Sequence, residues 1–249
     1  MISAIVLTYN EEEVLEDALK SLSGFADEIV LVDSNSTDKT HTIAKKYKAK
    51  VVTHELVSFA QQRNEGLKHA KGDFVFYLDA DERLSSEFKK EALALVTSYN
   101  PQSSIAGYFV KRKTYYFGRD WGLYDSVQRF FYKRKLIEWY GVVHETPRVD
   151  GEFGSILSPI LHYTHRSLEQ MLAKTNKWSN YEAELRFKAH HPKMTWWRFP
   201  RVMATEFYKS YFLQKGYKNG TYGIVESLYQ SFSMFITYAK LWELQTTKK

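Results

Sequence analysis

Short apolar runs alternate with amphipathic segments over the first hundred residues of this chain. The runs are short and almost continuously apolar, so we expect strands at 2–8, 28–32, 51–52 and 74–78. The segments between them predict helices that end near residues 23, 47, 70 and 99. Repeated strand–helix units with strands apolar on both faces predict an α/β protein with a mostly parallel sheet flanked by helices.

The residues expected to begin these helices are the polar ones that follow each strand. They are Asn10 with Glu13 as its capping-box partner, Ser36 or Thr37, Ser58, and Ser85 or Ser86.

The alternation stops at the polar break 100–104. Residues 105–165 predict further strands, and from residue 167 onward the pattern is helical. We therefore expect one domain at 1–165, divided into halves at 1–100 and 101–165, and a C-terminal helical region at 166–249.

Composition and charge narrow the class of protein. The 249 residues include no cysteine, which excludes a disulfide framework and thiolate metal sites and fits a reducing cytosol. The first expected strand leaves no room for a signal peptide, and no apolar stretch is long enough to span a bilayer. The net charge is +6, and the basic residues are unevenly distributed. The segment from Arg186 to Lys218 contains eight basic residues and a single acidic residue, Glu206.

Three expected strands end in polar clusters, at 8–11, 33–38 and 79–82. Carboxyl ends of parallel strands share one edge of a sheet, where they form a crevice suited to a nucleotide. No Gly-rich phosphate loop is present, so a cation must meet the phosphate charge. The pair Asp79 and Asp81 suits a hard divalent cation. For Asn10 and Ser36, helix capping and ligand contact both remain open.

Four of these segments, in this order, resemble the core of the family 2 inverting glycosyltransferases of GT-A fold. They are Val6–Glu11, Ile29–Asp38, Ala60–Gly66 followed by Ala70–Asp73, and Leu78–Glu82. The later segments Gly141–Glu145 and His162–Ser167 resemble a subgroup that adds sugars to the lipopolysaccharide core. The resemblance implies a nucleotide-sugar donor, most commonly a UDP-sugar, with 101–165 as the acceptor half.

The resemblance also implies roles by position. The nucleobase, ribose and donor sugar would lie beside residues at the three strand ends and on the helix after residue 58: Thr8, Tyr9, Asn10, Glu11, Asp33, Asn35, Arg63, Asp79 and Ala80. Asp33 would accept a hydrogen bond from the base or ribose, and Arg63 would lie beside the base. Arg129 would supply a cation near the diphosphate. Asp81, with Asp79, would ligate Mn²⁺ or Mg²⁺.

Inversion requires a base that takes the proton of the acceptor hydroxyl. Glu145 is the candidate, on an expected loop after a short apolar stretch, and Asp125 and Glu138 are its rivals. His162 ends an apolar run, so it is either a further metal ligand or a hydrogen-bonded core residue. His144 and His165 rank lower.

The sequence therefore predicts a metal-dependent inverting transferase that moves one sugar to a lipopolysaccharide-core or other lipid-linked acceptor. The processive signature Gln-x-x-Arg-Trp, known in relatives, is absent. The segment Trp196-Trp197-Arg198 with Arg201 predicts an anionic membrane surface as a partner, at the inner face of the cytoplasmic membrane, and no nucleic acid. The alternatives are a sugar-nucleotide pyrophosphorylase and a non-catalytic sugar-nucleotide-binding relative.

Overall fold

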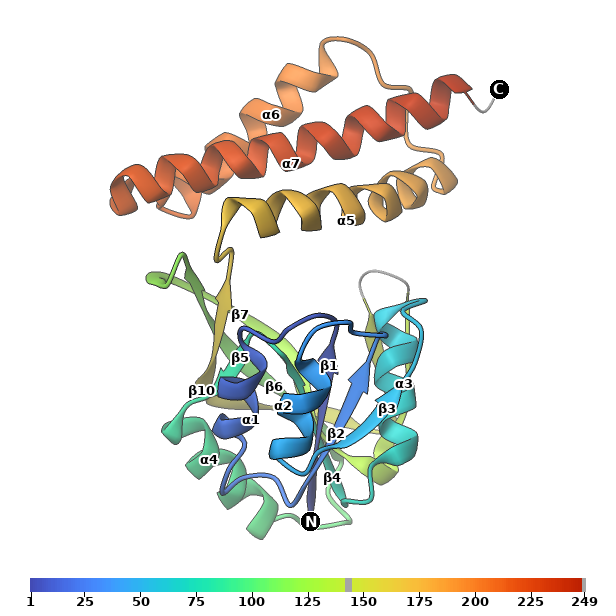
Figure 1. The fold of residues 1–249 in the computed structure, drawn as a ribbon, viewed down its shortest axis with the longest axis vertical. Coiled ribbons are helices and arrows are strands. Elements are labelled where there is room, and N and C mark those ends of the chain that lie inside the picture. The colour runs from blue at the N-terminus through green and yellow to red at the C-terminus, as the bar shows by residue number, and fades with distance from the viewer. Residues whose placement is uncertain (142–144, 248–249) are drawn as a thin grey trace. The chain divides into compact units, whose positions relative to one another are not determined.

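The computed structural model describes residues 1–141 and 145–247. The chain divides into two compact units (Figure 1). The first comprises Met1–Thr114 and Tyr124–Tyr163, and the second comprises Tyr115–Leu123 and Thr164–Lys249. The domain division predicted at residue 165, with halves meeting at residue 100, stays a prediction.

The first unit is built on an eight-stranded sheet with the strand order β3-β2-β1-β4-β7-β6-β10-β5. These strands are β1 (Ile2–Thr8), β2 (Glu28–Asp33), β3 (Lys50–Thr53), β4 (Phe74–Asp79), β5 (Glu82–Leu84), β6 (Ile105–Tyr116), β7 (Arg119–Tyr132) and β10 (Glu152–Thr164). The first four pair in parallel, whereas β7 runs antiparallel to β4 and β5 antiparallel to β10. A 3₁₀ turn (Lys133–Lys135) leads to a separate antiparallel pair, β8 (Leu136–Tyr140) and β9 (Thr146–Val149).

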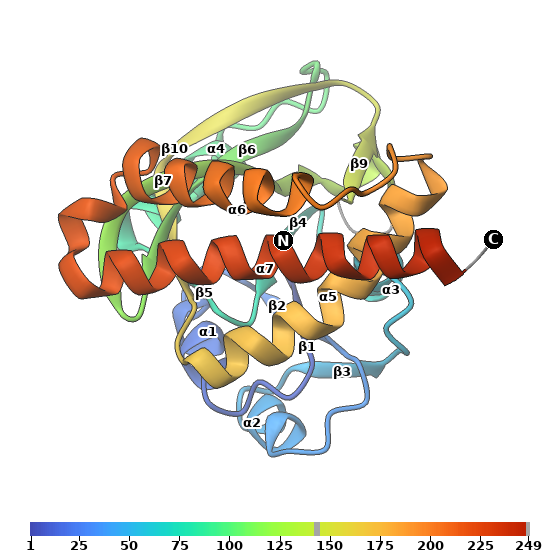
Figure 2. The same cartoon turned by 90° about the horizontal axis from the view of Figure 1, so that it is seen from above.

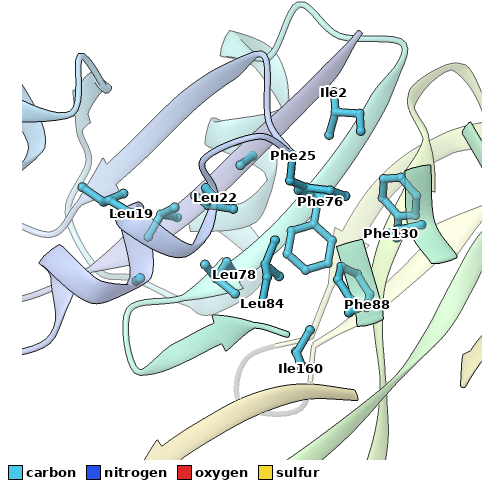
Figure 3. Packing of buried hydrophobic residues seen from close by; sticks show 14 of the residues in the cluster. Ile2, Leu19, Leu22, Phe25, Phe76, Leu78, Leu84, Phe88, Phe130 and Ile160 are labelled. Atoms are coloured by element: carbon cyan, nitrogen blue, oxygen red, sulfur yellow. The ribbon is translucent and has the colours of Figure 1, made fainter. Parts of the chain in front are cut away.

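Side chains alternate across the sheet and build a hydrophobic core on each face. On one face, Phe76 and Leu78 of β4 pack with Phe88 and with helical residues such as Leu19, as Figure 3 shows. This face carries α1 (Leu15–Ser21), α2 (Thr40–Lys46) and α4 (Ser86–Thr97). On the other face, Tyr77 of β4 packs with residues of α3 (Phe59–His69) and of the β8–β9 pair. The predicted α/β architecture, a GT-A-type nucleotide-binding sheet flanked by helices, is confirmed.

Two helix caps are confirmed and two are wrong. Ser58 accepts a hydrogen bond from the Gln61 amide, and Ser85 does the same for Phe88. In contrast, α1 begins at Leu15 rather than beside Asn10, and α2 begins at Thr40 rather than beside Ser36 or Thr37. The polar groups after β1 and β2 bind one another instead, so they cannot cap helices.

The second unit contains three helices, α5 (Leu168–Lys188), α6 (Arg198–Tyr208) and α7 (Gly220–Thr247). A π-helical turn (Lys209–Leu213) and a 3₁₀ turn (Gly216–Asn219) connect the last two. Helix α7 packs along both α5 and α6 (Figure 2), which confirms the C-terminal helical extension. Among the helices within residues 1–141 and 145–247, none combines the length and apolar character needed to cross a bilayer.

Candidate active site

The loops that follow β1 and β2 are tied together by side chain–backbone hydrogen bonds. Asn10 has a φ of +52°, and its side chain accepts a bond of 2.8 Å from the Thr37 amide. In return the Asn10 amide donates to Ser36 Oγ at 2.8 Å. One residue further, the Glu11 amide donates to Thr40 Oγ1 at 3.1 Å. These bonds fix the shape of the strand-end loops at the sheet edge where the nucleotide was expected.

Asp33, at the end of β2, is fully buried and accepts four hydrogen bonds. Its donors are Thr8 Oγ1 at 3.1 Å, the Ser36 amide at 2.8 Å, the Ser36 hydroxyl, and His41 Nε2 at 2.8 Å in the tautomer or charge state that carries a proton there. Burial by itself raises the pKa of this carboxyl, but the hydrogen bonds outweigh burial and hold the pKa below its usual value. An ionised carboxylate has about four acceptor positions, so Asp33 is saturated by the protein.

His41 was missed by the sequence analysis. It lies eight residues after Asp33, on α2, and its Nε2 contacts Oδ2 of Asp33. The predicted bond from Asp33 to a nucleobase or ribose stays a prediction, and a ligand making it would compete with the present donors, which include His41.

Asp79, the last residue of β4, lies between two arginines. Arg129 Nη2 on β7 bonds Oδ2, and Arg63 Nη2 on α3 lies 3.4 Å from Oδ1. Burial alone would raise the pKa of Asp79, but the positive charges of Arg129, Arg63 and Arg112 outweigh it and hold this pKa well below its usual range. Asp79 is therefore an anion bound on both sides by cations.

Glu82 extends this cluster and was also missed. Its carboxylate is completely buried at the start of β5, where Oε2 accepts the Asp79 amide at 3.0 Å. Oε1 lies 3.3 Å from Arg129 and 3.4 Å from Arg112. The sequence places Glu82 directly after the Asp-x-Asp pair, but only the return of β7 and β6 brings the two arginines to it.

Arg63 joins this cluster to Glu145. Its side chain is 2% exposed, and its Nε and Nη2 donate to Glu145 Oε1 at 3.0 and 2.9 Å. The predicted base therefore lies one guanidinium away from Asp79, although 66 residues separate Asp79 from Glu145 in the chain. The roles assigned to Arg63, Arg129 and Glu145 stay predictions.

Asp81 and His162 form a pair beside this cluster. Asp81 Oδ2 lies 3.4 Å from His162 Nε2, and both side chains are mostly buried. His162 Nδ1 is buried without a hydrogen-bond partner in the described residues. A carboxylate oxygen and an imidazole nitrogen side by side are donors that Mn²⁺ accepts, so this pair fits a divalent cation. Within the described parts of the chain, no three His, Asp or Glu side chains converge as a ligand set, and Asp79 is engaged by arginines.

The remaining predicted residues occupy different environments. Thr8 and Ala80 are buried, Tyr9 is about half exposed, Glu11 is half-buried, and Asn35 is exposed with a φ of +63°. Their contacts with a donor stay predictions.

The two rival bases and the two lower-ranked histidines are also placed, with one exception. Asp125 forms a two-point ion pair with Arg112, and Glu138 lies 2.7 Å from Arg148 across the β8–β9 pair. His165 lies in the second unit, with Nδ1 2.8 Å from Glu226. His144 lies outside the described residues.

Comparison with known families identifies the class. A family model described as "Glycosyl transferase family 2" matches residues 3–149, which is more than half of the chain. A glycosyltransferase of Rickettsia bellii, described as uncharacterized, is 30% identical over 98% of this chain and 86% of its own length. The chain therefore belongs to glycosyl transferase family 2, and it is a glycosyltransferase. The resemblance expected from the strand-end motifs is confirmed, whereas the pyrophosphorylase alternative finds no support.

Other similar proteins carry more specific names. The lipopolysaccharide core biosynthesis glycosyltransferase LpsC of Rhizobium meliloti is 25% identical over 99% of this chain and 94% of its own length. Among solved structures, Staphylococcus aureus TarS 1–349 in complex with UDP-GlcNAc has a TM-score of 0.48 at 15% identity, covering 100% of this chain and 92% of that chain. Glucosyl-3-phosphoglycerate synthase from Mycobacterium tuberculosis, in complex with Mn²⁺ and UDP, has a TM-score of 0.36 at 25% identity, covering 47% and 44%.

Proposed function

We propose that this protein is an inverting, metal-dependent glycosyltransferase that moves one sugar from a UDP-sugar to a lipid-linked glycan. The observation that carries the proposal is that Arg63 contacts both Asp79 and Glu145, while Asp81, two residues after Asp79, pairs with His162. These contacts support a site in which the end of β4 binds the donor and Glu145 serves the acceptor.

The donor nucleotide binds along the carboxyl ends of β1, β2 and β4. The loops after β1 and β2 are already fixed by their mutual hydrogen bonds, so little ordering entropy is lost when the nucleotide arrives. Thr8 orients Asp33 by a hydrogen bond of 3.1 Å. Buried Arg129 provides positive charge next to the last residues of β4, where the diphosphate is expected.

Asp81 and His162 would hold the divalent cation from the protein side. When bound, the cation acts as a Lewis acid that stabilises the charge developing on the diphosphate leaving group. Asp79 stays an anion held by Arg63 and Arg129, and it faces the ribose and the donor sugar.

Glu145 takes the proton of the acceptor hydroxyl. The acceptor oxygen forms a bond to the anomeric carbon as the bond from that carbon to the phosphate oxygen breaks, and the diphosphate leaves with the electron pair. One displacement at that carbon inverts its configuration. Asp125 is a weaker candidate because Arg112 binds both of its carboxylate oxygens. Glu138 is a weaker candidate because it pairs with Arg148, away from the Asp79 cluster.

The acceptor class rests on the chain's similarity to LpsC, whose name refers to lipopolysaccharide core biosynthesis. An acceptor of this kind is amphiphilic and lies at a bilayer. In the second unit, Trp196 is 82% exposed and Trp197 is 44% exposed, and the guanidinium groups of Arg198 and Arg201 lie 5.4 and 5.3 Å from the Trp197 ring. Exposed tryptophans beside cations suit an anionic membrane surface, which we propose is the inner face of the cytoplasmic membrane.

A panel of nucleotide sugars tests the catalytic proposal. The protein should hydrolyse one UDP-sugar slowly in the presence of Mn²⁺ or Mg²⁺ and much less with EDTA, because water can replace the acceptor hydroxyl. The Glu145→Gln variant should lose about a hundredfold or more in kcat while UDP affinity changes little. Binding of UDP-sugars without turnover under any condition would favour a non-catalytic sugar-nucleotide-binding protein instead.

A further inference from the structure

Arg63 is the most completely buried arginine of the cluster, and its surroundings fix its orientation. The guanidinium carbon lies 5.3 Å from the centre of the Tyr77 ring and 4.9 Å from the centre of the Trp139 ring. Both rings belong to the buried core between α3 and the sheet. An arginine against two aromatic faces cannot swing without losing these contacts, so its donors point in fixed directions.

Helix α3 also holds the strand that leads to Glu145. Asn64, the neighbour of Arg63, accepts the Trp139 amide at 2.8 Å and donates to the Trp139 carbonyl at 2.8 Å. This two-point contact fixes the end of β8 against α3. The chain on the acceptor side is thereby attached to the same helical turn that carries the guanidinium.

Arg63 contacts only one oxygen of Glu145. Nε and Nη2 both donate to Oε1, and among the described residues Oε2 of Glu145 has no hydrogen-bond partner. The same guanidinium reaches Asp79 Oδ1 at 3.4 Å. One side chain therefore sets the position of Glu145 relative to the end of β4.

We propose that Arg63 is the positioning residue of the acceptor base: it holds Glu145 by Oε1 and leaves Oε2 to take the acceptor proton. The inference rests on the proposed glycosyl transfer and gives Arg63 a role beyond the nucleobase contact expected from the sequence, which stays a prediction. Arg63 itself touches neither the reacting oxygen nor the anomeric carbon. Its contribution is to hold the Glu145 carboxylate in the correct orientation. Displacements of about 1 Å in such geometry can cost around a hundredfold in rate.

A double-mutant cycle tests this role, with hydrolysis of the UDP-sugar selected by the panel as the assay. Arg63→Gln should lower kcat by roughly tenfold or more, and UDP affinity measured by calorimetry should change less than about threefold. In the Glu145→Gln background, Arg63→Gln should add less than about threefold, because the carboxylate that it positions is already disabled. Arg63→Lys should be intermediate, since it keeps the charge without the rigid fork.

Lys68→Gln, on the exposed face of the same helix, is the matched control and should retain full activity. Thermal unfolding of each variant distinguishes a loss of folded protein from a change in the orientation of Glu145. If Arg63→Gln does not fold, Arg63→Lys is used for the test instead. If the decreases in kcat of the two single variants multiply in the double variant, the positioning role is overturned. A loss of UDP affinity as large as the loss of kcat would also overturn it. A wild-type protein that hydrolyses no donor would instead reject the proposed function.

Discussion

At the scale of single residues, the site is organised by carboxylates whose oxygens are already occupied. Asp33 receives four hydrogen bonds, Asp79 is bound by two arginines, and Glu82 is buried among Arg112, Arg129 and the Asp79 amide. Removing one partner from such a group leaves a buried charge uncompensated, which costs more than the pair contributes. Each substitution in this cluster therefore needs a stability control beside its activity assay.

Asp33 gives a prediction about pH. Its pKa in the folded state is lowered, so its contribution to stability is present above the unfolded value of about 3.9 and is lost as the pH falls through the folded value. Asp33→Asn should cost about 1–3 kcal/mol in the free energy of unfolding at pH 7. Urea denaturation at pH 7, 5 and 3 should show the gap between variant and wild type narrowing at the lowest pH. A gap that stays constant would contradict the assigned hydrogen bonds.

Asp81 gives a prediction about the metal. Asp81→Ala should lower kcat by about a hundredfold or more. This loss is larger than the loss of activity expected when a residue that only supports a metal ligand is removed. In a manganese titration of donor hydrolysis, the activity of the variant should respond much less to added Mn²⁺ than that of the wild type. The melting temperature of the variant should stay near that of the wild type. Asp73→Asn, at the other end of β4 and exposed, is the control. Retention of most activity in excess Mn²⁺ would remove Asp81 from the metal site.

At the scale of elements, α3 links the sheet to the candidate site, and it does so by lying very close to β1. A Cβ added at Gly66 would lie 2.3 Å from Ile5 Cγ2 and 3.1 Å from Val32 Cγ2. Only a residue without a side chain lets the helix backbone approach this closely. That approach brings Arg63, one turn earlier, to Asp79.

Gly66→Ala should therefore destabilise the protein by about 1–3 kcal/mol, because overpacking outweighs the better helix propensity of alanine. Lys68→Ala on the exposed side of α3 should change stability little. Chemical denaturation measures both variants. In an Ile5→Ala background the cost of Gly66→Ala should shrink, and an unchanged cost would show that the helix is not held by this contact.

At the scale of the whole molecule, binding to a bilayer is predicted from the second unit. Each basic side chain near an anionic surface contributes about 1 kcal/mol, and this attraction weakens as salt rises. The protein should co-sediment with anionic liposomes at low salt and be released at high salt. Replacing Trp196, Trp197, Arg198 and Arg201 by alanine should abolish sedimentation and spare hydrolysis of the free donor.

A second variant controls for the loss of two positive charges and of an exposed tryptophan. Trp242→Ala with Lys20→Ala and Lys45→Ala changes exposed residues of the same kinds elsewhere, so it should still sediment. If the wild type does not bind anionic liposomes at low salt, the exposed tryptophans serve another purpose.

Local sequence patterns were enough to predict the four parallel strands of the first hundred residues and the caps that depend on neighbouring residues. The bounds Ile2–Thr8 for β1 and the caps at Ser58 and Ser85 follow from local apolar patterning and from a side chain reaching an amide three residues ahead. It failed at Asn10 and Ser36, because those side chains bind a loop about 26 residues away rather than their own helix.

The contacts within the candidate site depend on how the chain packs in three dimensions. The motifs identified Asp33, Asp79 and Asp81 from their places at strand ends, since the carboxyl ends of parallel strands must share an edge. The charged partners of these residues come from α2, α3, β7 and β10, at separations that no local pattern encodes. A buried charge requires an opposite charge close to it in the folded chain. Which arginine pairs with each carboxylate therefore depends on three-dimensional packing and not on spacing in the sequence.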